Sequence, residues 1–598
     1  MDRLSRPSSL MRGWQDVTWS SVLNAKPSLV LLVGSFLCVL PVLVRGVADG
    51  PDLSSHLRFA QAFFESIKQG NAYPAWQHNA NSGFGDGSFR VYSPLFYYVL
   101  IAVRALTRDW FLSFRLVTWL LAFAGSWSIF YWVRGWGSRT QAILAALIYC
   151  FGPFRMNELY GSAMLPEFGG AVWFALLLGF TERLATNQVP HNRLSLVRAL
   201  VALCSAGLVL THIPLAMMAV FVIPMYALFR RDRNKGSRKL SDLFLPAILG
   251  GALSAFYWMD LLYELPLVKG TMVDSAQRFD FRANLAFSTS SQSPWSWYVN
   301  FLFVTTFALV VPGLVLLFGS KRFEIQRHSA LLTVLVVGLF TFFMTTPLSS
   351  PLWVYVPKLS AMEFPWRWLA ASSILASGIA GFSFPILCSR VVAAKAEHEN
   401  ISNAKNQSAR QLYSRARLNL LLSSGALLVA FSFAISYPLR NAMFLDRQAF
   451  QAVLESSRSS TGLEEWLPRW TTSRTVGEAP QKESRLVAIS GRNVSIDSWL
   501  SESRQFTVGA GNATVATLRT LYYPYWKFQT KAGLVLSANP DDNGILKIDV
   551  PPEVQTIQMR FVRPPHQIVG TCVSLLGALI LSSMVFFSVL RKTTPSCS

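Results

Sequence analysis

Long apolar runs recur along the chain, and no other feature of the sequence constrains its fold as strongly. A helix rises about 1.5 Å per residue, so about 20 apolar residues cross the roughly 30 Å hydrocarbon core of a bilayer. Charged residues make up only 14 % of the chain, whereas soluble domains hold about a quarter. We therefore expect a mainly α-helical polytopic membrane protein with twelve spans, at 27–44, 110–133, 140–157, 169–181, 198–211, 213–229, 243–262, 298–318, 329–346, 369–388, 418–437 and 568–590.

The formal net charge of +22 comes from basic residues that fall in alternate loops between these spans. Cytoplasmic loops of membrane proteins carry an excess of Lys and Arg, so the pattern places these loops and both termini in the cytoplasm. The charge is then an orientation signal for a protein of the cell (inner) membrane, and no nucleic-acid partner is expected. The residues concerned are Arg3, Arg6, Arg12, Lys26, Arg134, Arg139, Arg230, Arg231, Arg233, Lys235, Arg238, Lys239, Lys321, Arg322, Arg327, Arg591 and Lys592, with a further group at 390–417.

This topology places five regions on the outer side of the membrane, at 45–109, 158–168, 263–297, 347–368 and 438–567. The middles of the predicted spans hold almost no charge, whereas transporters and proton pumps keep ionisable groups there. None of the six cysteines lies in the outer soluble region, so no zinc site is expected in it. The polar chemistry of the chain therefore gathers at its outer interface.

The same pattern divides the chain into segments. A cytoplasmic loop is expected at 391–417, because that stretch is polar. The predicted segments are a cytoplasmic N-terminus at 1–26, a transmembrane domain at 27–437, an outer β-rich domain at 438–567, a final span at 568–590 and a tail at 591–598.

The outer domain alternates apolar and polar residues as half-buried strands do. "QTIQMRFV" shows this alternation, and "GILKIDV" follows the turn "NPDDNG". Further strands are expected at 484–490, 503–509 and 512–523. A small antiparallel β-sandwich is the expected fold. Its aromatic residues either stack on a sugar ring or fill the sandwich core, and they are Tyr522, Tyr523, Tyr525 and Trp526.

The first outer loop, 45–109, contains the stretch Asp52 to Gln69, whose apolar spacing predicts an amphipathic helix at the membrane surface. Asp52 follows a proline and is placed to cap this helix, and His56 lies one turn later on the same face. Two interpretations of the pair stay open, a helix cap with its i+4 partner or part of an active site. A second, short interfacial helix is expected in "YSPLFYYVLIAV".

Other ionisable residues of the outer side extend the second interpretation. They are Asp49, Glu167 in "YGSAMLPEFGG" and Arg367 in "EFPWRW". A carboxylate can take the proton of an attacking hydroxyl, and a guanidinium can hold a phosphate leaving group through two hydrogen bonds. If these side chains converge above the bilayer, they suit a reaction at a lipid phosphate.

The order of several segments resembles a known family. They are "DLSSHLRFAQAFFESIKQGNAYPAW", "NSGFGDGSFRVYSPLFYYVL", "YGSAMLPEFGG", "LSAFYWMDLLYE", "EFPWRWL", "TGLEEWLP" and "YYPYWKFQTKAG". The chain resembles the bacterial polytopic membrane proteins called "6-pyruvoyl-tetrahydropterin synthase related", with YfhO-like proteins as neighbours. More distantly it resembles the GT-C class of integral-membrane glycosyltransferases. The sequence has no His-rich zinc ligand set, so the family name does not imply pterin chemistry.

The GT-C resemblance implies transfer of a sugar from a polyprenyl-phosphate donor to a glycan, lipid or protein hydroxyl on the outer face. It implies that Asp52 is the base, that Glu167 positions acceptor or sugar, and that His56 tunes Asp52. The implied substrate-binding residues are Arg367, Asp49, His78, His212 and Trp76.

The first outer loop also bears on metal use. Some metal-dependent relatives carry an Asp-x-Asp or Asp-Glu pair in the first loop, whereas this chain has "DGPD". We therefore expect catalysis without a metal cofactor, and a divalent cation shared by Asp49, Asp52 and Glu167 is the alternative. Two further alternatives are a non-catalytic membrane component that transports or scaffolds lipid-linked polysaccharide, and a sensor whose sandwich binds glycan.

Overall fold

The computed structural model describes residues 26–231, 240–270, 280–288, 296–318, 329–400, 407–460, 466–472 and 485–593. Several basic residues of the predicted cytoplasmic loops lie outside these ranges, namely Arg3, Arg6, Arg12, Arg233, Lys235, Arg238, Lys239, Lys321, Arg322 and Arg327.

Within these ranges, eight helices are long and apolar enough to cross a membrane. They are α3 (Pro27–Arg45), α6 (Trp110–Val133), α9 (Leu165–Ala185), α10 (Leu194–Thr211), α11 (Ile213–Arg230), α18 (Trp368–Asn400), α19 (Gln407–Asn441) and α22 (Pro565–Thr593). Three bent pairs raise the number to eleven if each pair forms one span. These pairs are α12 (Ser241–Leu253) with α13 (Ala255–Glu264), α14 (Ser296–Ala308) with α15 (Val311–Phe318), and α16 (Ser329–Phe343) with α17 (Ser350–Tyr355). The mainly helical, polytopic fold predicted from the sequence is confirmed.

The third predicted span, 140–157, is not a single helix. α7 (Arg139–Cys150) ends after 12 residues, and its last carbonyl accepts a hydrogen bond from Cys38 Sγ at 3.1 Å, near the middle of α3. Pro153 then interrupts the helix, because proline has no N–H to continue the hydrogen-bond ladder. The chain continues as the short helix α8 (Pro153–Met156) and a π-helical turn, η3 (Asn157–Gly161). After Cys150, which lies level with Cys38 of α3, the short helix α8 and the turn η3 therefore replace the rest of the predicted span.

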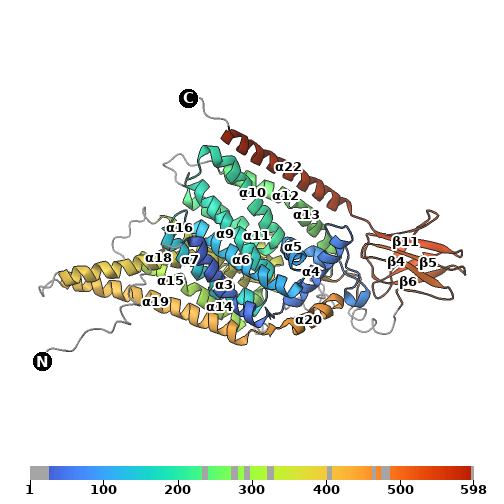
Figure 1. The fold of residues 1–598 in the computed structure, drawn as a ribbon, viewed down its shortest axis with the longest axis horizontal. Coiled ribbons are helices and arrows are strands. Elements are labelled where there is room, and N and C mark those ends of the chain that lie inside the picture. Colours follow the sequence, from blue (N-terminus) through green and yellow to red (C-terminus); the bar gives the residue numbers. More distant parts are fainter. Residues whose placement is uncertain are drawn as a thin grey trace.

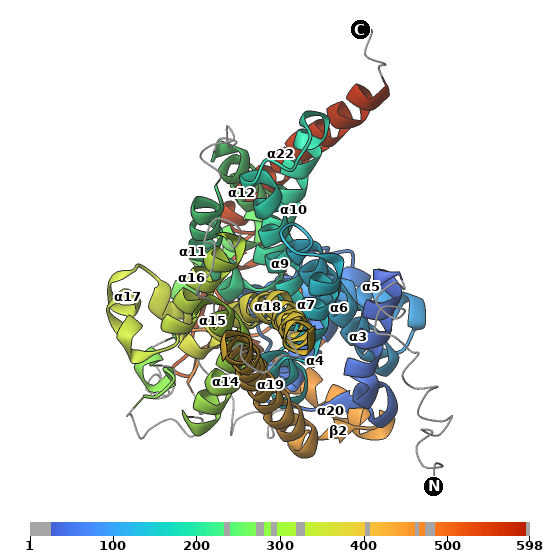
Figure 2. The same cartoon turned by 90° about the vertical axis from the view of Figure 1, so that its left-hand side faces the viewer.

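α18 runs through the centre of the bundle (Figure 2), between α7, α15, α16 and α19. Its residues Leu369, Ile374 and Ile379 are fully buried. A Cβ on Gly381 would lie 2.4 Å from the Cα of Ala145 in α7, so only glycine permits this approach. Small residues bring helices together inside a membrane in this way.

The helices α18 and α19 continue beyond the bundle as a hairpin, which projects from the end opposite the β-sheet domain (Figure 1). The loop predicted at 391–417 is therefore wrong over most of its length, because α18 reaches Asn400 and α19 starts at Gln407. The stretch "VVAAKAEHEN" is polar, yet alanine, lysine and glutamate are strong helix formers, and this propensity decides its structure.

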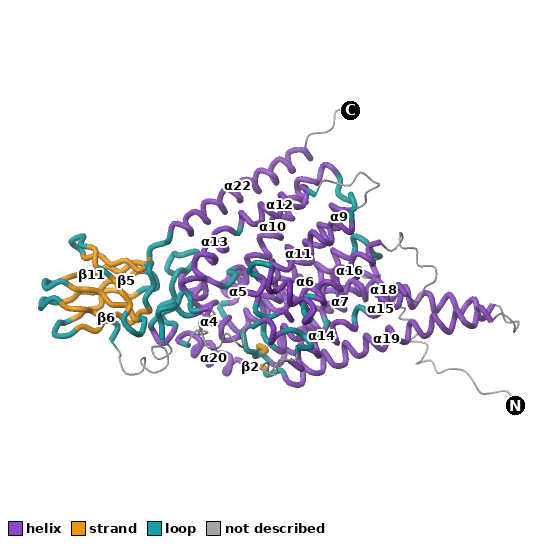
Figure 3. Tube along the Cα trace, turned by 180° about the vertical axis from the view of Figure 1, so that it is seen from behind, coloured by secondary structure: helices purple, strands orange, loops and turns teal. Residues whose placement is uncertain are grey.

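The β-sheet domain consists of two antiparallel sheets (Figure 3). One sheet has the order β3-β6-β10-β9, with β3 (Val487–Ile489), β6 (Thr514–Leu521), β10 (Ile545–Val550) and β9 (Ala538–Pro540). The other has the order β4-β5-β11-β7-β8, with β4 (Val494–Trp499), β5 (Ser503–Val508), β11 (Gln555–Phe561), β7 (Trp526–Thr530) and β8 (Val535–Leu536). Ile557, Met559 and Phe561 of β11 point into the core, as their alternation predicts. In the described part of the chain, the first strand of the sandwich begins at Val487, whereas the domain was predicted to start at 438.

The first outer loop contains the two predicted helices, α4 (Leu53–Lys68) and α5 (Leu95–Thr107). α4 is covered on one side by α5 and on another by α20 (Arg447–Ser459), so its apolar face is buried in protein. The two-residue strands β1 (Val47–Ala48) and β2 (Phe444–Leu445) pair antiparallel and fix the start of this loop to the end of α19.

Candidate active site

Asp52 stands at the N-cap position of α4, but its carboxylate makes no capping hydrogen bond. Its backbone N–H donates to the carbonyl of Ser162 at 3.3 Å, which joins the first outer loop to the irregular segment after α7. A Cβ on Gly50 would lie 2.6 Å from the carbonyl carbon of Ser162, so glycine is needed at this contact. The structure therefore does not support the interpretation of Asp52 as a helix cap, and its side chain is left for other contacts.

His56 lies one turn along α4 and is buried. Its Nδ1 is 3.0 Å from the hydroxyl of Tyr97, and among the described residues Nε2 has no hydrogen-bond partner. Burial lowers the pKa of His56 to about 4, although the negative charge of Asp52 opposes this shift. His56 is therefore neutral at pH 7, one helical turn from Asp52.

Glu167, in the first turn of α9, is fully buried, with 1 % of its side chain exposed. In the described part of the chain, neither carboxylate oxygen accepts a hydrogen bond. Its Oε2 lies 3.5 Å from Nε2 of His212 and 4.0 Å from Nε of Arg367. A buried carboxylate without donors is costly, so this arrangement is typical of a site completed by a bound molecule.

The tautomer of His212 follows from its position at the start of α11. Its Nδ1 accepts a hydrogen bond from the backbone N–H of Leu215 at 3.4 Å, so the neutral ring carries its proton on Nε2, toward Glu167. Burial lowers the pKa of His212 well below its usual value, and the neighbouring Arg367 and His56 lower it further. His212 therefore faces Glu167 as a neutral imidazole 3.5 Å away, without a hydrogen bond to its carboxylate.

The pKa of Tyr92 responds to the charges of both Asp52 and Arg367. Burial raises the pKa of its hydroxyl, the charge of Asp52 raises it further, and Arg367 opposes this shift. The rings of Tyr92 and His56 are 6.5 Å apart between centroids. Asp52 and Arg367 thus act electrostatically on the same tyrosine, although more than 300 residues separate them in the sequence.

Arg155 and Glu158, which lie in the irregular segment, were not predicted from the sequence. Arg155 Nη1 is 3.1 Å from Oε2 of Glu158 and donates to the carbonyl of Phe168 at 2.7 Å. Burial raises the pKa of Glu158 to about 7, although Arg155 opposes the shift. Glu158 and Asp52 both act electrostatically on Glu167. Arg155 fell inside a predicted apolar span, and a charge in such a place is itself a signal of function.

Asp49 lies next to the cluster. Its carboxylate accepts a hydrogen bond from Gly50 N–H at 2.9 Å, and its own N–H donates to the carbonyl of Met443. Among the described residues, Asp49, Asp52 and Glu167 do not form a group close enough to share a metal ion. The absence of a metal cofactor stays a prediction.

A second polar cluster lies between α13, α22 and the sandwich. Asp260, Glu264 and His566 have ligand atoms within 4.8 Å of one another, a separation that a metal ion could bridge. The guanidinium of Arg90 already lies between the two carboxylates, 2.7 Å from Asp260 and 3.2 Å from Glu264. Glu264 also accepts a hydrogen bond from Tyr523 of the sandwich. We interpret this cluster as the ionic connection between the helices and the sandwich.

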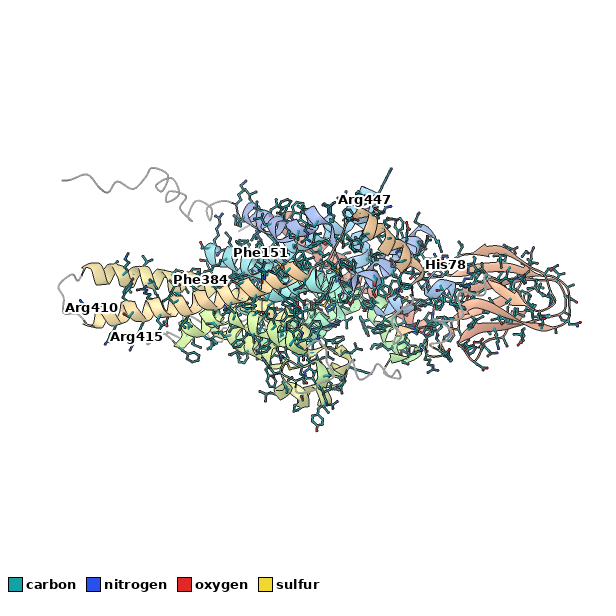
Figure 4. The ribbon with its side chains drawn as sticks, turned by 90° about the horizontal axis from the view of Figure 1, so that it is seen from below. His78, Phe151, Phe384, Arg410, Arg415 and Arg447 are labelled. Atoms are coloured by element: carbon teal, nitrogen blue, oxygen red, sulfur yellow. The ribbon has the colours of Figure 1, made fainter. Side chains whose placement is uncertain are left out.

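Trp76 and His78 do not join the candidate site. Trp76 is 1 % exposed in the sandwich core, with its ring 5.6 Å from that of Trp526. His78 lies where the first outer loop meets the sandwich (Figure 4), and its Nδ1 is 3.0 Å from Oγ of Ser501. Tyr523 and Trp526 are buried beside Trp76, so these three aromatic residues belong to the sandwich core, whereas Tyr522 and Tyr525 are half-buried.

Residues 89–405, more than half of the chain, match the model of the 6-pyruvoyl-tetrahydropterin synthase related domain, which is described as a membrane protein. The chain belongs to this family. An uncharacterized protein of Lactococcus lactis subsp. cremoris (strain MG1363) is 26 % identical over 246 residues, which cover 40 % of this chain. The aligned region spans only 39 % of that relative.

Among solved structures, the chain is similar to three GT-C glycosyltransferases. The oligosaccharyltransferase of Archaeoglobus fulgidus, tethered to an acceptor peptide, has a TM-score of 0.42 and 13 % identity, and the match covers 72 % of this chain and 57 % of that one. The arabinofuranosyltransferase AftD from mycobacteria has a TM-score of 0.41 and 16 % identity, with coverage of 70 % and 28 %. ArnT of Cupriavidus metallidurans, bound to undecaprenyl phosphate, has a TM-score of 0.35 and 15 % identity, with coverage of 74 % and 77 %.

Proposed function

We propose that this family member is an inverting membrane glycosyltransferase that transfers a sugar from a polyprenyl-phosphate donor to a hydroxyl group at the outer membrane surface. The observation that carries the proposal is the buried carboxylate of Glu167, without hydrogen-bond donors and flanked by His212 and Arg367. It lies beside irregular backbone, which membrane proteins tolerate only where it is buried in protein or lines a cavity.

The roles follow from the charges and the exposure of the side chains. Asp52 is half-buried and makes no capping bond, so it can take the proton of the acceptor hydroxyl. The acceptor oxygen then attacks the anomeric carbon, and the bond from that carbon to the phosphate oxygen breaks. The polyprenyl phosphate leaves with the bonding electrons, and the partly exposed guanidinium of Arg367 stabilises its charge. His212 and Glu167 position the sugar hydroxyls by hydrogen bonds.

The experiment compares lipid-linked and surface glycans, by mass spectrometry, in cells with no copy, wild-type protein or Asp52→Asn at matched membrane expression. Asp549→Asn, at an exposed position of β10, is the control because it makes the same change away from the site. Asp52→Asn and Arg367→Gln are expected to lower the product at least about 100-fold. Restoration of every glycan by Asp52→Asn would instead favour a scaffold or transport component of lipid-linked polysaccharide.

We also propose that the α18–α19 hairpin faces the cytoplasm and the sandwich faces outward, with both chain termini in the cytoplasm. Arg410 and Arg415 lie on the hairpin, at the end opposite the sandwich (Figure 4). The excess of basic residues on cytoplasmic loops supports this orientation. In a variant without native cysteines, Lys531→Cys in the sandwich should react with an impermeant maleimide in intact cells, and Arg410→Cys only after permeabilisation. The reverse result would invert the topology and remove the outer-face reaction.

A further inference from the structure

A cleft of about 400 Å³ opens between α4, the α5–α6 turn and α20, away from the candidate active site. Four arginines line it, Arg104, Arg108, Arg447 and Arg458, together with the carboxylates of Asp109 and Glu455. A third carboxylate, that of Glu65, pairs with Arg458 beside the cleft, so the four guanidinium groups leave an excess of one positive charge. We call it the arginine cleft, and its size is that of small-ligand sites in proteins.

Two of these arginines have their charge balanced. Arg447, which extends from α20 (Figure 4), forms an ion pair with Asp109. Arg458 lies 2.6 Å from a carboxylate oxygen of Glu65. The structure describes no such ion pair for Arg104 or Arg108. The unbalanced charge of the arginine cleft therefore resides on the α5 side.

Arg104 is held in place by aromatic rings. Its guanidinium lies 5.7 Å from the ring centroid of Phe64 and 5.6 Å from that of Trp110. Its Nε is buried and has no hydrogen-bond partner in the described part of the chain. A positioned guanidinium with an unused donor is pre-organised for an anion, since little side-chain entropy is lost on binding.

Arg108 ends α5 in the left-handed region, with φ of +56°. A residue other than glycine rarely adopts this conformation, and such strain collects at functional positions. The turn brings Arg108 next to Asp109, which caps α6 by accepting from Leu112 N–H at 2.7 Å. An exposed arginine is thus kept at the rim of the cleft.

The position of the cleft relative to the membrane indicates the source of the anion. α6 is a candidate span that begins at Trp110, so the cleft lies at its membrane interface, where tryptophan is enriched. Leu106 is 85 % exposed and Leu112 37 % exposed, and both lie within a few residues of the cleft-lining arginines. Apolar surface beside the cleft suits acyl chains, while the arginines lie at the depth of the headgroups.

The arginine cleft is separate from the candidate active site, although both involve α4. Asp52 and Gln61 are nine residues apart, and at about 100° per residue this places them on opposite sides of the helix. Gln61 lines the cleft and donates to the carbonyl of Leu454 in α20 at 2.9 Å.

We propose that the arginine cleft binds a phosphate-bearing anion, and specifically the headgroup of an anionic phospholipid. Arg104 and Arg108 donate to the phosphate oxygens, and the acyl chains lie along Leu106 and Leu112. The bound lipid fixes α20 against α4 and α5. This proposal does not depend on the proposed function, because it uses none of the residues of the candidate active site.

The test uses the full chain in detergent with equal amounts of phosphatidylglycerol and phosphatidylcholine, and native mass spectrometry counts the retained lipids. Wild-type protein is expected to retain phosphatidylglycerol preferentially. Arg104→Gln/Arg108→Gln should weaken this binding about tenfold or more, since two charge-assisted hydrogen bonds are lost. Arg440→Gln, exposed at the end of α19, is the matched control. Gln451→Glu adds a negative charge at an exposed position of the cleft without removing packing, and it should also weaken binding.

A second arm adds inorganic phosphate and follows thermal unfolding. Stabilisation of wild-type protein but not of the double variant, without a preference between lipids, would keep the phosphate site and make its ligand a soluble anion. Equal retention of both lipids by wild-type protein, with no stabilisation by phosphate, would overturn the proposal. So would unchanged lipid binding by both Gln451→Glu and the double variant.

Discussion

Arg90 Nη2 lies 2.7 Å from both carboxylate oxygens of Asp260, although 170 positions separate the two residues in the sequence. Both side chains are almost completely buried, at 1 % and 0 % exposure. Desolvation makes such a pair weak as a source of net stability, but removing one partner leaves an uncompensated charge. The pair therefore fixes the position of the loop that carries Arg90 against α13.

Arg90→Met is expected to lower the free energy of unfolding by about 3–5 kcal/mol, because two buried carboxylates lose their cation. Thermal unfolding of the purified protein measures this loss, with Arg560→Met on the exposed side of β11 as the control. Neutralising the carboxylates as well, in Arg90→Met/Asp260→Asn/Glu264→Gln, should recover part of the loss. An Arg90→Met variant as stable as wild type would show that the network does not hold the domains.

Asp52→Ala should change the free energy of unfolding by less than about 0.5 kcal/mol, since Asp52 makes no capping bond. Asp446→Ala is the matched comparison, because Asp446 caps α20 by accepting from Ala449 N–H at 2.8 Å. Its loss should cost about 1 kcal/mol. Equal losses in the two variants, measured by chemical denaturation, would return Asp52 to the role of a helix cap.

His56 should make the fold sensitive to acid. Its pKa is about 4 in the folded protein and about 6.5 in the unfolded chain. Between these pH values the unfolded chain therefore binds a proton that the folded protein does not bind. The contribution of His56 to the free energy of unfolding is fully present above pH 6.5, and it falls by at most about 3 kcal/mol as the pH drops to 4. The Tm of His56→Gln should therefore decrease less than that of wild type between pH 7.5 and pH 4.5. Parallel decreases in the two proteins would contradict the burial of a neutral imidazole.

Trp76→Ala is expected to lower the free energy of unfolding by about 3–5 kcal/mol, because it leaves a cavity in the sandwich core. Trp297→Ala, which removes a ring that is 56 % exposed, should cost less. Limited proteolysis and the loss of near-ultraviolet circular dichroism report on the sandwich. If Trp76→Phe kept the full stability but abolished glycan transfer, Trp76 would be a substrate contact after all.

Much of the transmembrane fold could be predicted from the sequence, because length and hydropathy determine which segments span a membrane. α4 and the strand β11 were also predictable, since their apolar residues follow the periods of a helix and of a strand. The interruption of the span 140–157 was not predicted. An apolar run does not show where backbone leaves the helix, and here Pro153 and the buried pair of Arg155 and Glu158 decide it.

The candidate site was predictable in part. The sequence placed Glu167 and Arg367 on the same side of the membrane but left open whether they converge, and the structure brings them to 4.0 Å from each other. The pairing of Arg90 with Asp260 was not predicted. Asp260 lies in an apolar run, and the residues around it do not indicate a partner 170 residues away in the sequence. The resemblance implied that Trp76 binds substrate, and its burial could not be predicted because it depends on a sandwich formed by a distant part of the chain.

The pairing of β1 with β2 has a consequence for biosynthesis. Val47 faces Leu445, so the strand that precedes Asp52 meets its partner only after almost 400 further residues have been made. At about 5–20 residues per second, a nascent chain takes roughly 20–80 s to reach that point. During this time the backbone N–H and C=O groups of β1 lack their partner strand. The start of the first outer loop thus completes its strand pairing only after α19 has been synthesised.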